Sequence, residues 1–321
     1  MAFSKIHSPA ESLIKNQYIL VSDKSRINEL IAAVGDPQSL IPAQWIQLMA
    51  FVLEFKPDLI LELGRGFGNS TCAFTEACHL MAPEPCEVVS LCISKSWDFH
   101  TAPRLKKVVK DEWFSPLKAI RADILEFNFE QVLLNKKRVV VFWDAHGFDI
   151  AECVLGSLLP LIKDRDHLVI MHDLSDNRYN GEQLRYYADK GLWKGRNNFS
   201  GLRVWIGNIE SGVEQVVAIN DFSKRNRITL HSSDESYFTE ISDEQWKKMV
   251  ETFGFNRVSR NGHWFWFSLN EASMEITFPH FTKRTTIKSI TAKLNCIIIS
   301  EFAHLYYIVS RTMKKNSHKD N

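Results

Sequence analysis

The feature that most constrains the fold of this chain is a glycine-rich turn directly after a short apolar run. Residues 59–63 are apolar except for Glu62. Three glycines follow at alternate positions: Gly64, Gly66 and Gly68. Apolar residues at helical spacing then occupy 71–81. Because glycine lets a backbone turn sharply and approach a ligand closely, this stretch predicts a buried strand, a tight turn and a helix.

The same alternation of strand and helix repeats along the chain. Apolar runs that predict strands recur at 88–93, 117–120, 138–143 and 167–171. Helical spacing fills 150–162, and in 9–55 it indicates two or three helices before the first strand. Strands that alternate with helices predict a doubly wound, mostly parallel α/β sheet covered on both faces. Such sheets bind ligands beyond the carboxyl ends of their strands, where the glycine turn lies.

Beyond residue 175 the alternation weakens. We expect an N-terminal helical segment (1–55), a main domain (56–270) and a C-terminal helical extension (271–321). Residues 175–240 form an insertion in the main domain, suited to a lid or substrate loop, with short strands at 202–206 and 213–219. After it, Ser242 and Gln245 predict the start of a capped helix, and 263–269 a closing strand.

Composition excludes some classes of partner. The 39 Lys and Arg residues nearly balance the 38 Asp and Glu residues of this 321-residue chain, so no long-range field attracts nucleic acid.

The six cysteines include no C-x-x-C pair and most lie in apolar runs, which favours reduced core thiols. Neither a signal pattern nor a membrane-spanning apolar run is present, so we expect a cytoplasmic protein.

The stretch 286–313 alternates apolar clusters with lysine and arginine. One interpretation is an interfacial helix that lies on an anionic bilayer as a peripheral membrane contact. The other is a helix docked on the protein's own core or on a second copy in a homo-oligomer, and we favour it because apolar stripes usually face a core.

The spacing of the glycines identifies a family. A dinucleotide-binding turn prefers G-x-G-x-x-G, whereas here the third glycine comes one residue earlier. In addition, an acid, Glu62, stands two positions before the first glycine. This pattern resembles the first motif of class I S-adenosylmethionine (SAM)-dependent methyltransferases. The resemblance implies a Rossmann-like fold and SAM as cofactor, with Gly64, Gly66, Gly68 and Asn69 around its methionine moiety and Glu62 orienting its amino group. A glycine-rich turn of another nucleotide-binding α/β protein is the alternative.

Two further family positions contact the nucleoside. The family carries an acid at the end of the second strand for the ribose hydroxyls, but here Ser94 occupies that position and no carboxylate comes before Asp98. The same absence counts against a nicotinamide enzyme. Asp123, after the third expected strand, matches the acidic position near the adenine. Its alternative role is a helix or turn cap.

Acidic and histidine residues follow the fourth and fifth expected strands: Asp144, His146, His172 and Asp173. The block from Val139 to Asp173 resembles the methyltransferase-24-like group, which includes O-methyltransferases of small molecules and sugars. In metal-dependent relatives, carboxylates at these strand ends hold magnesium, so Asp144 and Asp173 are the metal candidates. Without a metal, Asp144, His146 or His172 would accept the proton of the acceptor hydroxyl.

The expected function is therefore O-methylation of a small-molecule or sugar-containing acceptor, with SAM as cofactor and magnesium as a candidate second cofactor. The alternative is a non-catalytic accessory protein on a methyltransferase fold, which the missing acid after the second strand favours. A nicotinamide or nucleotide-sugar enzyme is disfavoured by the glycine spacing.

Overall fold

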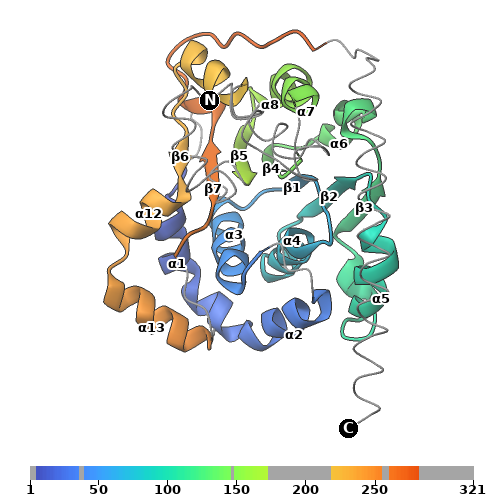
Figure 1. Cartoon of the computed structure of the whole chain (residues 1–321), viewed down its shortest axis with the longest axis vertical. Coiled ribbons are helices and arrows are strands. Elements are labelled where there is room, and N and C mark those ends of the chain that lie inside the picture. The colour runs from blue at the N-terminus through green and yellow to red at the C-terminus, as the bar shows by residue number, and fades with distance from the viewer. Residues whose placement is uncertain (1–4, 36–39, 146–147, 173–217, 255–259, 282–321) are drawn as a thin grey trace, which may run out of the picture.

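The structure is a computed structural model that describes residues 5–35, 40–145, 148–172, 218–254 and 260–281. Within these residues the sheet has seven strands in the order β3-β2-β1-β4-β5-β7-β6 (Figure 1). The strands are β1 (Leu59–Leu63), β2 (Glu87–Cys92), β3 (Leu117–Arg121), β4 (Arg138–Trp143), β5 (Asp166–His172), β6 (His231–Ser232) and β7 (Trp264–Phe267). The first five are parallel, and β7 pairs antiparallel with β5 and β6. The expected Rossmann-like, mostly parallel α/β fold is confirmed.

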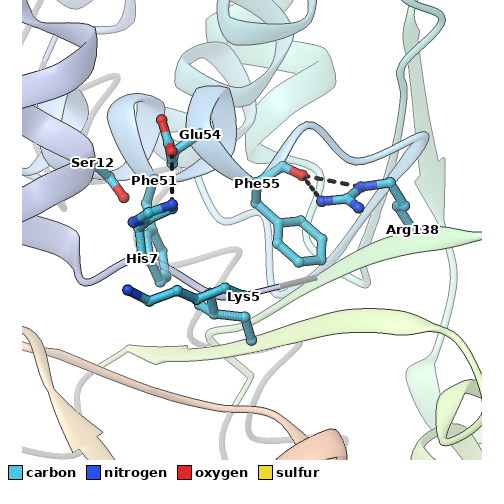
Figure 2. A pocket seen from close by; sticks show the side chains of 8 residues that line it. Lys5, His7, Ser12, Phe51, Glu54, Phe55 and Arg138 are labelled. Atoms are coloured by element: carbon cyan, nitrogen blue, oxygen red, sulfur yellow. Dashed lines mark hydrogen bonds and ion pairs between the residues drawn. The ribbon is translucent and has the colours of Figure 1, made fainter. Parts of the chain in front are cut away.

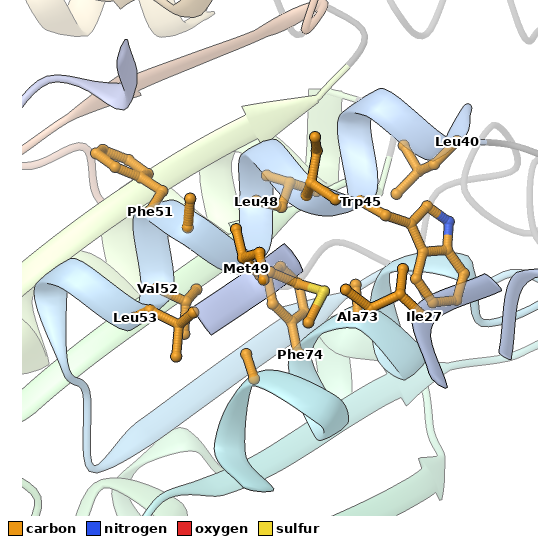
Figure 3. Close-up of a cluster of buried hydrophobic side chains, with 14 of the residues drawn as sticks. Ile27, Leu40, Trp45, Leu48, Met49, Phe51, Val52, Leu53, Ala73 and Phe74 are labelled. Carbon is orange, nitrogen blue, oxygen red and sulfur yellow. The ribbon is translucent and has the colours of Figure 1, made fainter. Parts of the chain in front are cut away.

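One face of the sheet is covered by the N-terminal helices together with later ones (Figure 1). These helices are α1 (Pro9–Ser22), α2 (Lys24–Val34), α3 (Pro42–Phe55), α4 (Asn69–Leu80), α12 (Ser233–Glu240) and α13 (Asp243–Phe253). Nearly every residue of α3 is buried, because it lies between α1, α4 and the sheet. Figure 3 shows Met49 of α3 beside Phe74 of α4. The segment 1–55 thus contributes to the same core as the sheet.

The other face carries shorter helices. They are α6 (Phe129–Leu133), α7 (Phe148–Cys153) and α8 (Leu159–Ile162), with a π-helical turn, Val154–Leu158, between the last two. Together these confirm the helix expected at 150–162. Shorter turns lie at Trp97–Thr101, which leads into α5 (Ala102–Leu105), and at Asp111–Phe114, Ile124–Glu126 and Leu269–Glu271.

One expectation for the later part of the chain needs correction. The strand expected at 213–219 lies mostly outside the described residues, and its described end, Ala218 and Ile219, begins a helical stretch. The described part of the C-terminal extension, 272–281, contains no helix, and the helix expected in this extension begins only at residue 286. This segment is tied to the helical stretch that begins at Ala218: the backbone N–H of Thr277 donates to Oδ1 of Asn226 at 2.7 Å. Residues 202–206 and 286–313 lie outside the described part.

Local sequence determines the helix ends. Ser242 accepts a hydrogen bond from the Gln245 backbone, and the Gln245 side chain accepts one in return, which is the capping box expected there. Ser8 and Glu11 form the same box at the start of α1. In β7, the ring of Trp264 packs against that of Phe51 of α3.

The described cysteines are free thiols: Cys72, Cys78, Cys86, Cys92 and Cys153. Among the described residues, no helix has the length and apolar character needed to cross a membrane.

Candidate functional site

The glycine turn lies at the carboxyl end of β1, beside β4, where the strand order reverses. Gly64 has φ +104°, and a Cβ there would lie 2.5 Å from the carbonyl oxygen of Asp144. The Asp144 backbone N–H in turn donates to the carbonyl of Leu63 at 2.8 Å. A side chain at position 64 is therefore excluded by both strain and space, and the turn is held against the end of β4. Such a switch point is where open α/β sheets bind ligands.

The other two glycines face different surroundings. Gly66 (φ +52°) is exposed, and a Cβ there would meet nothing within 4 Å. Gly68 (φ +86°) lies under the ring of Trp97, 2.4 Å from where its Cβ would be. Asn69 begins α4 directly after it and is 1% exposed. The open side of the turn is thus at Gly66.

Glu62 is turned into the protein below the start of α4. It is fully buried and accepts hydrogen bonds from Ser70 at 2.5 Å, from Thr71 at 2.5 Å and from Ser90. Burial raises the pKa of this carboxyl, and the three hydroxyls and the nearby charge of Arg65 oppose that rise. Both carboxylate oxygens are therefore engaged by the protein and the side chain has no exposed surface, so a direct contact with a cofactor amino group would require this cluster to open.

Sequence reasoning missed Arg65 and the turn Trp97–Thr101. Arg65 is 3% exposed and donates to the carbonyl of Ser90 at 2.5 Å, and its guanidinium lies 5.8 Å from the centre of the Trp97 ring. Thr101 donates to the carbonyl of Phe67 at 2.6 Å. The sequence offered no signal for these residues, because position 65 of the motif accepts any side chain and the turn has no pattern of its own.

The nucleoside candidates occupy the ends of β2 and β3. The hydroxyl of Ser94 lies 2.8 Å from that of Ser96 and accepts from the Ser96 backbone at 3.1 Å, so it forms a local turn. Asp123 accepts from the backbone of Leu125 at 3.1 Å. The capping role considered for Asp123 is thus present, and its role near an adenine stays a prediction.

Asp144 and His172 meet at the ends of the neighbouring strands β4 and β5. His172 Nδ1 lies 3.4 Å from Asp144 Oδ1, and the side chains are 5% and 20% exposed respectively. The ring of Phe142 lies 6.2 Å from that of His172 and shields it. The carboxylate is therefore the member that reaches solvent. His146 and Asp173 lie outside the described residues.

The described residues do not complete a magnesium site. Among them, no three Asp, Glu, His or Cys side chains lie close enough together to hold a metal ion. Asp144 offers one oxygen ligand, but its described neighbour His172 offers nitrogen, and magnesium prefers oxygen. The magnesium expectation thus depends on Asp173.

A pocket at the opposite edge of the sheet, beside the amino end of β4, is not part of this site (Figure 2). Its polar groups largely satisfy one another. Arg138 donates to the carbonyl of Phe55 at 3.1 Å and pairs with Asp166 at 2.8 Å, while His7 lies 3.4 Å from Glu54.

The solved structures to which this chain is similar include methyltransferases of low sequence identity. No protein-family model and no curated protein matches this sequence. A SAH-bound methyltransferase from Podospora anserina is 18% identical, with a TM-score of 0.41 over 66% of this chain and 81% of that chain. An O-methyltransferase from Bacillus cereus in complex with SAH is 15% identical, with a TM-score of 0.41 over 68% and 88%. The O-methyltransferase TomG from Streptomyces achromogenes, in complex with SAM, is 16% identical, with a TM-score of 0.38 over 72% and 83%. Because one fold hosts many activities, similarity of fold alone does not determine the function of this chain.

Proposed function

We propose that this chain is a class I SAM-dependent methyltransferase that methylates a hydroxyl of a small-molecule or sugar-containing acceptor. The observation that carries the proposal is the packing of Gly64 against Asp144, where a Cβ would lie 2.5 Å from the Asp144 carbonyl. It brings a turn suited to close approach by a ligand next to a carboxylate and imidazole pair. Methyl transfer needs its donor and acceptor aligned in one crevice in this way.

The turn and the start of α4 would hold the cofactor. SAM, when bound, supplies a methyl group already activated by its sulfonium, so the protein has to align the reactants and handle one proton. Gly66 offers the open surface. The backbone N–H groups at the start of α4, near Asn69, favour an anionic group such as the carboxylate of a methionine moiety.

Asp144 and His172 would handle the proton of the acceptor hydroxyl. Asp144 is the more exposed of the two, so its carboxylate meets the acceptor and accepts the proton. His172 Nδ1 lies 3.4 Å from Asp144 Oδ1 and is the neighbouring group to which that proton would pass.

The experiment that tests the proposal is calorimetric titration of the protein with SAM and SAH, with and without magnesium. Gly66→Arg is expected to abolish binding, because the new side chain would occupy the open face of the turn. Gly254→Arg is the matched control: Gly254 also has a positive φ, +72°, and open space around its Cβ, but it ends α13 away from the site. Equal binding by both variants would exclude a cofactor at this turn.

A non-catalytic accessory protein is the second candidate. Glu62 is engaged by three hydroxyls, and the end of β2 carries Ser94 in place of an acid. Both observations favour a site that has lost its cofactor. The same titration separates the candidates, since an accessory protein would bind neither SAM nor SAH.

A further inference from the structure

Two cysteines meet outside the candidate site. Cys78 lies in the last turn of α4 and Cys86 directly precedes β2, and their sulfur atoms are 2.7 Å apart. Both are free thiols, Cys78 buried and Cys86 partly exposed. A disulfide bond is about 2.05 Å long, so less than about 1 Å of movement separates this pair from one.

The loop between the two cysteines holds them together. It contains Pro83 and Pro85, whose rings fix the backbone φ angle. It is also tied by backbone hydrogen bonds, from Ala82 to His79 at 3.1 Å and from Glu84 to Met81 at 3.0 Å. The contact between the thiols is therefore built into an ordered connection between α4 and β2.

The two thiols differ in environment. The Cys78 thiol donates its hydrogen to the sulfur of Cys86. That hydrogen bond raises the pKa of Cys78 well above its ordinary value, and burial of the thiol adds to the rise. Cys86 accepts this hydrogen bond and is the less buried residue of the two, so it is the first target for an oxidant.

We propose that Cys78 and Cys86 form a dithiol–disulfide pair, a modification site oxidised by a peroxide. The Cys86 sulfur attacks one peroxide oxygen, the O–O bond breaks, and a sulfenic acid forms with release of one water. The Cys78 sulfur then attacks the sulfenic sulfur, and its hydroxyl leaves with a proton as a second water. One S–S bond forms, and the two electrons that the sulfurs lose reduce one peroxide to two waters.

The bond would join the end of α4 to the beginning of β2. The glycine turn lies at the other end of α4, so the cofactor site is not distorted. A short closed loop restricts the unfolded chain, and we expect oxidation to raise the melting temperature by about 4 °C. This inference does not depend on the proposed function.

The test uses the full-length protein treated with hydrogen peroxide, with the remaining thiols blocked and the chain then cleaved at methionine by cyanogen bromide. Met81 is the one methionine between the two cysteines, so cleavage leaves Cys78 in fragment 50–81 and Cys86 in fragment 82–171. We expect these fragments to stay linked until a reductant is added.

Variants identify the linked residues. Cys86→Ala is expected to abolish both the linkage and the rise in melting temperature, and Cys78→Ala to do the same if it folds. Cys92→Ala, which removes the other partly exposed thiol among the described residues, is the matched control and should keep both. Unlinked fragments in the oxidised wild type, oxidation of Cys86 to a sulfinic acid without linkage, or linkage that persists in Cys86→Ala would each overturn the proposal.

Discussion

Glu62 is an acid with no solvent-exposed surface, near the end of the buried strand β1. A buried carboxylate is tolerated where hydrogen bonds replace its water, and Ser70, Thr71 and Ser90 supply them. Two of these hydroxyls belong to the first turn of α4, so the acid fastens the helix to the strand at the glycine turn. It also lies near the positive end of that helix, which favours a negative charge.

The glycines of the turn differ in what a side chain would meet, and this predicts different costs. Gly66→Ala is expected to lower the free energy of unfolding by about 1 kcal/mol, because only the left-handed backbone opposes it. Gly68→Ala should lower it by about 3 kcal/mol, because its Cβ would also collide with the Trp97 ring. Chemical denaturation measures both. Equal losses would mean that Trp97 yields without cost.

Single residues of the site were predictable only where backbone chemistry dictates them. The spacing of Gly64, Gly66 and Gly68 is readable because few residues adopt a positive φ. The partners of Glu62 were not, because Ser90 is 28 positions away and joins it only through strand pairing. The position of Trp97 over Gly68 depends likewise on how the chain returns after β2.

At the scale of elements, long buried strands were predictable and short ones were not. The runs that became β1 and β4 are almost wholly apolar, as strands buried on both faces are. The two residues of β6 carry no periodicity, and they are a strand only because they pair with β7. Residues 272–281 resisted prediction because their packing depends on distant groups, such as the Asn226 side chain.

His167, near the start of β5, hydrogen-bonds to the backbone just after β7, and its buried position predicts a pH dependence of stability. Its Nδ1–H donates to the carbonyl of Arg165 at 2.9 Å, and its Nε2 accepts from the backbone of Leu269 at 2.8 Å. Burial lowers the pKa of His167 from 6.5 to about 4. The folded-state pKa is thus below the unfolded one, so this contribution to stability is complete above pH 6.5 and is lost as the pH falls through 4.

Between these pH values the free energy of unfolding should fall by about 3 kcal/mol on account of His167. Urea denaturation at a series of pH values measures the fall. In His167→Gln, whose amide can keep both hydrogen bonds without titrating, that part of the slope should disappear. Identical slopes in variant and wild type would show that the imidazole is not held neutral.

At the scale of the whole molecule, the sheet separates two cores that draw on different parts of the chain. One contains α1, α3 and α4 with residues of α12, α13 and β7. The other contains α6, α7 and α8 with the opposite faces of the same strands. The first core therefore depends on contacts between helices that precede the first strand and a strand near residue 265.

Phe51 of α3 and Trp264 of β7 report on that dependence. Their ring centres lie 5.2 Å apart at an angle of 40°, and both side chains are buried. A double-mutant cycle with Phe51→Leu and Trp264→Phe should give a coupling of about 1 kcal/mol in the free energy of unfolding. The control pairs Phe51→Leu with Phe129→Leu, because Phe129 lies in the core on the other face of the sheet and the two effects should add within about 0.5 kcal/mol. Additive effects in the first cycle would mean that α3 and β7 stabilise the fold independently, so that contact between their rings adds nothing to the burial of each.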